Sequence, residues 1–352
     1  MKRAFGSVIV MSVCLPALAP QAFGQGHALN PQVIQTGIPA RLVELTAHLT
    51  VTNQTATPVR RYVFRLTTPV EEAASQRTAL LSSDIPPTTV KTHKTGANHY
   101  LEFHLPVGPN ATVQNAVKFL VLVVPVDYMQ TKMLGKARTG GIPSFEPYIK
   151  PSRHVEADCP EVRAAAKQVF RSTQTANEKA LAAYRYPSQV LKFRLQNTVL
   201  GAQKALQMGT GDCTEHACVF VALCRTQGIP ARRVGVFNLG PNNEIAKPQP
   251  NHDIAEVYLR THGWIPVDAN LGHGRDDRPI GFGKLSNTCI IMNREGSWGW
   301  STSLPPDSYS RAATKPQMKP SISWKAKVLK EGKVQELIRE FARLKRSRLK
   351  RR

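Results

Sequence analysis

The sequence predicts an α+β protein in which an all-β domain precedes a domain of helices and strands. Residues 33–126 alternate apolar and polar side chains, with many β-branched residues and regular turn signals. Past residue 151 the apolar residues recur with a helical period, and strand-like runs follow at residues 233–237, 254–259 and 264–268. This change of period places helices beside an antiparallel sheet in the second domain.

The first domain is expected to be an immunoglobulin-like β-sandwich spanning residues 27–127. Its strand-like runs include residues 42–51, 61–66 and 119–124, and Pro86-Pro87 is one of the turn signals between them. Nothing in this domain points to catalysis. We therefore expect it to support the second domain or to present substrate to it.

Residues 1–24 have the pattern of a secretory signal peptide. Met1-Lys2-Arg3 gives a positive start, a mostly apolar stretch follows to Ala19, and Ala22-Phe23-Gly24 offers small residues around a cleavage point. The apolar stretch is shorter than the roughly 20 residues that a membrane span needs. We therefore expect an exported protein, periplasmic or associated with the cell envelope, whose mature chain begins near Gln25.

Three helical stretches open the second domain, which we place at residues 150–300. Pro160 stands at the first helical position of a stretch that reaches about Ser172. A second stretch covers residues 176–184, and a third covers residues 191–208. These helices lead directly to the segment that carries the chemistry.

A fourth helix is expected to begin at Cys213. Asp212 is a natural N-cap, Gly211 allows a tight turn before it, and Gly228-Ile229-Pro230 ends the helix after Gln227. The helix has almost no polar side, so it should lie at the centre of the domain. Its N-terminal amide groups and dipole favour the thiolate form of a cysteine placed there. Cys213 is therefore a candidate nucleophile.

A histidine and an acid follow on two neighbouring strands. His252 enters one strand of a predicted hairpin and Asp268 leaves the other, so both lie near the same end. A four-residue turn pairs Leu259 with Trp264, which puts Asp268 opposite Ala255 and on the wrong face for the histidine. The hairpin would then need a bulge or a strong local twist to bring the two side chains together.

Cysteine, histidine and acid in this order are the groups of a thiol-based acyl-transfer site. The base deprotonates the nucleophile, and the acid orients the base. We take Cys213, His252 and Asp268 as the candidate catalytic residues. His216, one helical turn from the cysteine, is the alternative base, and Glu256 is expected to support the site structurally.

Four segments of the second domain carry a specific pattern, at residues 211–217, 223–232, 252–258 and 263–268. Together they resemble the transglutaminase-like (transglutaminase core) superfamily of exported bacterial proteins. The similarity covers about residues 150–295. It implies a papain-like core of helices packed on an antiparallel sheet, with Cys213 as the nucleophile, His252 as the base and Asp268 as the orienting acid.

Two departures from the family pattern affect the site. Asp253-Ile254 follow the histidine, where the family often has a small residue and an aromatic one, and Ala269-Asn270 follow the acid in place of Pro-Thr. The tryptophan that some members place upstream of the cysteine to bind the oxyanion is missing before Cys213. Tyr184, Tyr186 or backbone amides are the alternatives for that role.

The resemblance implies an exported thiol enzyme, a transglutaminase-like cysteine peptidase or amidase or a protein-glutamine acyltransferase, with a protein or peptide as substrate. The acyl group on Cys213 passes to water or to a lysine amine, and we expect hydrolysis first and crosslinking second. A non-catalytic envelope binding or scaffold protein that keeps the fold is the alternative. No cofactor or metal is expected, because the chemistry needs none and no loop has the acidic pattern of a calcium site.

Positive charge gathers at the C-terminal end. The net charge is +23, and residues 315–352 hold 14 Lys or Arg against 3 Glu. We expect residues 301–352 to form a proline-containing linker and a basic amphipathic helix with apolar residues from Val334 to Leu344 on one face. This helix either attaches to an anionic membrane surface or envelope polymer, or docks on its own domain. Nucleic acid is not an expected partner of an exported protein.

Five cysteines remain after the predicted signal peptide: Cys159, Cys213, Cys218, Cys224 and Cys289. Up to two disulfides among the four other than the candidate nucleophile are compatible with an oxidising compartment, and their connectivity does not follow from the sequence. The chain has no C-x-x-C pair of the kind that binds zinc.

Overall fold

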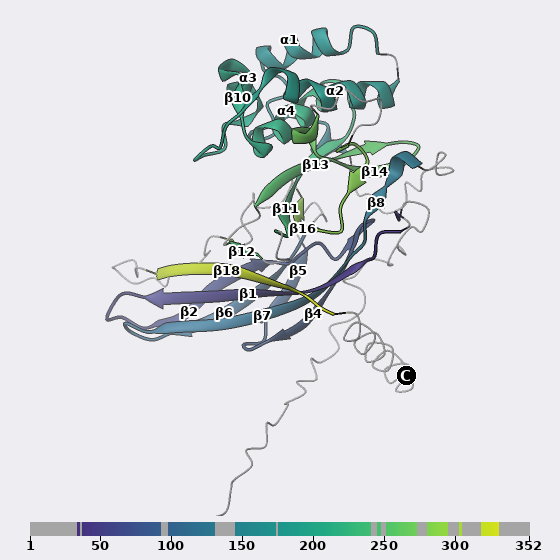
Figure 1. Cartoon of the computed structure of the whole chain (residues 1–352). Coiled ribbons are helices and arrows are strands. Elements are labelled where there is room, and N and C mark those ends of the chain that lie inside the picture. The colour runs from purple at the N-terminus through teal and green to yellow at the C-terminus, as the bar shows by residue number, and fades with distance from the viewer. Residues whose placement is uncertain are drawn as a thin grey trace, which may run out of the picture.

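The computed structural model describes residues 34–35, 37–92, 98–130, 145–173, 175–240, 245–247, 251–272, 280–294, 303–304 and 318–330. The predicted signal peptide and the predicted tail helix lie outside these residues. Helices form one end of the molecule, a four-stranded sheet lies in the middle, and a β-sandwich forms the other end (Figure 1). This is the predicted α+β fold with an all-β domain ahead of it.

Two sheets make up the sandwich. The first has the strand order β12 (Ala246–Lys247), β18 (Met318–Val328), β1 (Arg41–Asn53), β7 (Thr112–Val123), β4 (Gln76–Ser83), β3 (Glu72–Ala73). The second has the order β17 (Ser303–Leu304), β2 (Val59–Thr67), β6 (His99–Val107), β5 (Thr89–Thr92). Alternate apolar side chains of the long strands fill the core between the sheets, as a period of two requires.

Strand β18 corrects the prediction of a linker within residues 301–352. It pairs antiparallel with β1 along its whole length and so completes the first sheet. Trp324 and Ala326 are buried, whereas Lys325 and Lys327 between and beside them are exposed. The prediction was wrong here because exposed lysines resemble a solvated basic segment when only charge is considered, whereas in this strand they alternate with buried residues.

Four helices form the second domain's helical layer: α1 (Pro160–Val169), α2 (Ala176–Val190), α3 (Gly201–Met208) and α4 (Cys213–Thr226). Their order follows the prediction, but the third helix begins ten residues later than expected. The chain before it instead forms β9 (Lys192–Phe193), which pairs in parallel with β10 (Thr210–Gly211). Helix α4 is buried among the other elements, as its apolar sides predict.

The central sheet has the order β14 (Gly263–Val267), β13 (His252–Leu259), β11 (Ala231–Asn238), β16 (Cys289–Arg294), and all neighbours are antiparallel. Its edge strand β16 joins the sandwich. The side-chain amide of Gln76 donates to the carbonyl of Ile291 at 2.9 Å and accepts from its N–H at 2.7 Å. Ile290 and Met292 belong to the sandwich core, so the two domains share packed apolar surface at this edge.

Short elements complete the chain: β8 (Val126–Asp127), η2 (Tyr128–Gln130), η3 (Glu146–Tyr148), η4 (Ala269–Leu271) and β15 (Lys284–Leu285). Within the described residues, no helix has both the length and the apolar character to cross a membrane. The five cysteines of the described chain form no disulfide with one another.

Candidate active site

The N-terminus of α4 is fixed by a capping box around Cys213. One carboxylate oxygen of Asp212 accepts the N–H of Thr214 at 2.9 Å, and the other accepts the N–H of Gln196 at 3.0 Å. In return, Glu215 accepts the N–H of Asp212 at 3.0 Å. These bonds satisfy donors that the first turn of a helix leaves without partners, and they hold the half-buried Cys213 at the first helical position.

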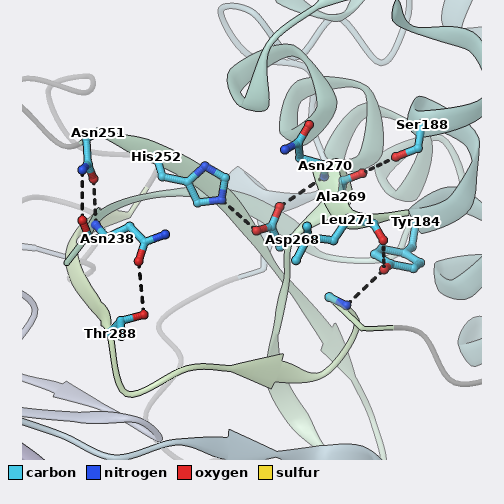
Figure 2. Close-up of polar contacts among 11 residues, drawn as sticks. Tyr184, Ser188, Asn238, Asn251, His252, Asp268, Ala269, Asn270, Leu271 and Thr288 are labelled. Carbon is cyan, nitrogen blue, oxygen red and sulfur yellow. Dashed lines mark hydrogen bonds and ion pairs between the residues drawn. The ribbon is translucent and has the colours of Figure 1, made fainter. Parts of the chain in front are cut away.

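The imidazole of His252 meets the carboxylate of Asp268. The Nε2–Oδ2 distance is 2.7 Å, and Figure 2 shows the ring directed at the carboxylate. The other carboxylate oxygen accepts the N–H of Asn270 at 3.2 Å, which fixes the orientation of the acid. Cys213 is the second side chain that raises the pKa of the imidazole, which puts the thiol beside His252. The structure therefore brings together the three residues that the sequence pattern selected.

The hairpin register differs from the expected one by one residue. Leu259 pairs with Gly263 and Tyr258 with Trp264, so the loop has three residues instead of four. Gly263 has a φ of 75°, the left-handed conformation that closes three-residue hairpin loops. The shift moves Asp268 to the face of the sheet that His252 occupies, because side chains alternate along a strand. No bulge in this hairpin is needed.

The contacts of His252 change its charge. Burial lowers its pKa, but hydrogen bonds and charge from Asp268 and Cys213 outweigh burial and raise the pKa to about 10. The imidazole therefore keeps its proton at neutral pH. This arrangement can hold a proton taken from the thiol and release it to a departing amine.

Two side chains of helix α2 hydrogen-bond the backbone next to Asp268. The hydroxyl of Tyr184 donates to the carbonyl of Leu271 at 2.8 Å and accepts the N–H of Gly281 at 3.1 Å, and Ser188 donates to the carbonyl of Ala269 at 2.9 Å (Figure 2). Tyr184 is 2% exposed. Its hydroxyl thus holds the turn that follows Asp268, and it is not positioned as the oxyanion donor that the sequence left open.

Asp253, one of the departures from the family pattern, connects the histidine strand to the cysteine helix. Its carboxylate accepts the hydroxyl of Thr214 at 2.6 Å. Burial raises the pKa of Asp253, while the Thr214 hydroxyl and the charge of Arg233 oppose that rise. The sequence shows that Asp253 departs from the family pattern beside His252. It does not show that Thr214 on α4 is the hydrogen-bond partner of Asp253.

His216, the alternative base, and Glu256, the expected supporting residue, are both buried and hydrogen-bonded within the protein. His216 is fully buried, and its Nδ1–H donates to the carbonyl of Asp212 at 2.7 Å. Glu256 is buried between Arg232 and Arg294, whose Nε atoms lie 2.7 and 2.9 Å from it. Burial raises the pKa of Glu256, but the two guanidinium groups lower it by more than burial raises it. The resulting pKa is about 2. Glu256 therefore ties three strands of the central sheet together, as expected of a supporting residue.

Part of the chain is similar to known proteins. The family model of the transglutaminase-like superfamily matches residues 163–269. An uncharacterized protein of Haemophilus influenzae is 29% identical over 146 residues, which cover 35% of this chain and 39% of the relative. The alignment thus spans about two-fifths of the length of the curated relative.

Solved structures resemble the chain at lower identity. A structure described as a "Putative Cysteine Protease" from Cytophaga hutchinsonii is 17% identical with a TM-score of 0.53, covering 83% of this chain and 92% of that one. The periplasmic domain of TgpA from Pseudomonas aeruginosa is 16% identical with a TM-score of 0.32, covering 64% and 87%. The first of these shows a shared fold. Residues 163–269, which include Cys213, His252 and Asp268, therefore match a transglutaminase-like domain, and the chain shares its α+β fold with the first of these structures.

Proposed function

We propose that the protein is a thiol enzyme that transfers the acyl group of an amide or peptide bond. Cys213 is the nucleophile, His252 the general base and acid, and Asp268 the group that orients the histidine. The observation that carries the proposal is the 2.7 Å bond from His252 Nε2 to Asp268 Oδ2, which leaves Nδ1 as the nitrogen available to the thiol.

In the proposed reaction, the proton of the Cys213 thiol already lies on Nδ1 of His252, which is an imidazolium at neutral pH, and the thiolate sulfur attacks the carbonyl carbon. The capping bonds engage the N–H groups of Thr214 and Glu215, so the N–H of Cys213 is the first-turn donor for the oxyanion. The imidazolium then protonates the departing amine, which leaves a thioester. Water, deprotonated by His252, attacks the thioester and regenerates the thiol.

Hydrolysis is the proposed outcome, and transfer to a lysine amine is the second candidate. The shared fold with the structure described as a "Putative Cysteine Protease" favours hydrolysis. We also propose that the protein is exported and acts in the periplasm or at the cell envelope. The signal-peptide pattern of residues 1–24 supports that location.

Isotope labelling separates these outcomes. Wild type, Cys213→Ala and Asp268→Asn would be incubated with a peptide mixture in oxygen-18 water containing a primary amine, and the products read by mass spectrometry. Hydrolysis places oxygen-18 in a new carboxyl group, and crosslinking chemistry attaches the amine. Both products should disappear in Cys213→Ala. If wild type and Cys213→Ala give the same peptides, the proposal fails and the non-catalytic scaffold replaces it.

A further inference from the structure

Strand β9 runs beside the N-terminus of α4. Phe193 pairs with Gly211, two residues before Cys213. The N–H of Lys192 donates to Gly209, and the N–H of Arg194 donates to Gly211, both at 2.9 Å. Successive peptide groups of a strand point to opposite edges, so the N–H and C=O of Phe193 point to the edge away from β10. Among the described strands, β9 has no neighbour on that edge.

The side chains of this segment alternate in character. Phe193 is 50% exposed and Leu195 is 79% exposed. Lys192 and Arg194, between and before them, are exposed as well. A single exposed apolar residue needs no explanation. Here Phe193 in β9 and Leu195, two residues past it, are both large and exposed and alternate with basic residues beside the segment that leads to Cys213, so they describe a surface that can bind an extended chain.

We propose that β9 is the subsite that binds the acyl donor, which adds to its outer edge as an extended strand. The inference rests on the proposed function and names its substrate class: a peptide with a bulky apolar residue paired with Phe193. Residues paired across two strands share a face. The positions on either side of the apolar residue therefore face Lys192 and Arg194, and acidic residues are favoured there.

Geometry sets the distance between this subsite and the reacting bond. Gly211 and Cys213 are two residues apart, at most about 7 Å between their Cα atoms. A peptide on the outer edge of β9 lies two strand spacings of about 4.8 Å from β10. The apolar residue therefore binds about three or four positions from the reacting carbonyl. Backbone hydrogen bonds to the edge supply affinity, and the alternating side chains supply specificity, as in other cases of strand addition.

Matched peptides and variants test the subsite. A peptide library is incubated with wild type, with Phe193→Ser plus Leu195→Ser, and with Leu81→Ser, whose leucine is 41% exposed on the sandwich strand β4. Cleavage or amine attachment should favour peptides with an apolar residue about three or four positions from the reacting bond. The double variant should lose about tenfold in kcat/KM on these peptides, and Leu81→Ser should lose nothing.

Two further probes address the backbone and the charges. Methylation of the peptide nitrogen of the apolar residue removes an edge hydrogen bond and should reduce kcat/KM by about tenfold. Lys192→Glu with Arg194→Glu should change the preference at the flanking positions from acidic to basic residues. An unchanged preference in this variant would contradict the assignment of the flanking positions.

The failures of the two proposals are distinguishable. Turnover that is identical in wild type and Cys213→Ala would overturn the proposed function, and the subsite with it. Turnover that depends on Cys213 but keeps the same peptide preference in the Phe193→Ser, Leu195→Ser variant would overturn the subsite alone. Alkylation of Cys213 by iodoacetamide should proceed equally in wild type and this variant; a slower rate in the variant would contradict a role of Phe193 and Leu195 in substrate binding alone.

Discussion

At the residue scale, the charge of His252 follows from two contacts. Its folded pKa of about 10 lies above its ordinary value of 6.5. A group with a raised folded pKa stabilises the protein fully below its unfolded pKa, and this stabilisation is lost as the pH rises through the folded value. The contribution of His252 should therefore decline between about pH 6.5 and 10.

Asp268→Asn removes the carboxylate charge beside His252 and should lower the pKa of the histidine. The free energy of unfolding, measured in urea across this pH range, should then fall less with rising pH than in wild type. A titration of the His252 ring by NMR gives the pKa directly. An equal pH slope in wild type and Asp268→Asn would show that Asp268 does not hold the proton on the histidine.

Thr214 and Asp253 offer a second test at this scale. Thr214→Val keeps the shape of the side chain but leaves the Asp253 carboxylate without the hydroxyl that now lies 2.6 Å away. We expect a loss of about 1–3 kcal/mol in the free energy of unfolding. Thr214→Ser retains the hydroxyl and should stay close to wild type. Equal stability of the valine and serine variants would mean that this bond does not tie β13 to α4.

At the element scale, the sequence predicted helix α4 correctly because its signals are local. An N-cap, a continuous apolar run and a terminating Gly-Ile-Pro all lie within the segment itself. The hairpin of β13 and β14 was predicted one residue out of register. Its loop length depends on the left-handed conformation of Gly263, which the sequence permits without requiring.

Strands β9 and β18 also show that local sequence patterns do not predict every element. β9 was predicted as helix, and β18 was predicted as part of a linker. A two-residue strand has too few residues to display a period, and β18 is recognised by its partner β1, which lies far away in the sequence. Non-local pairing therefore decided the elements that local patterns missed.

Gly281 tests how closely the segment after β14 packs against the acid. A Cβ at Gly281 would lie 2.5 Å from the carbonyl oxygen of Asp268 and 3.2 Å from its Cβ. Gly281→Ala should therefore displace Asp268 and slow alkylation of Cys213 by at least about tenfold, on the scale of effects that small misplacements have in active sites.

Gly263→Ala is the matched control, since a Cβ there meets no atom within 4 Å. It should cost only the strain of a left-handed alanine, about 1–2 kcal/mol in the free energy of unfolding. Cys213 should react at the wild-type rate. If the two alanine variants behave alike in both measurements, contact with Asp268 is not the reason for the glycine at position 281.

At the scale of the whole molecule, β18 links the first sandwich strand, β1, to the segment that precedes His252. It pairs with β1 on one side and with β12, a few residues before His252, on the other. Trp324 is fully buried, with its ring centroid 6.1 Å from that of Phe119 and 5.8 Å from that of Phe237. Trp324→Ala should cost about 3–5 kcal/mol in the free energy of unfolding, measured by denaturation in urea. A loss below about 1 kcal/mol would contradict a core role.

A deletion can remove the basic tail and leave strand β18 of this core in place. Residues 331–352 follow the last described residue, Lys330. A deletion of these residues should leave the free energy of unfolding near that of wild type, and it should release the protein from envelope fractions at moderate salt if the tail binds an anionic surface. A deletion that begins before β18 would remove a core strand as well. Unchanged fractionation after the shorter deletion would rule out surface attachment through the tail.

The central claim is that His252 activates Cys213. The most direct test is the rate of Cys213 alkylation by iodoacetamide against pH, read by peptide mass spectrometry in wild type and His252→Ala. We predict fast labelling at neutral pH in wild type, and slower labelling in the variant that rises only near the ordinary thiol pKa of about 8.5. The same ordinary thiol profile in both proteins would contradict the account.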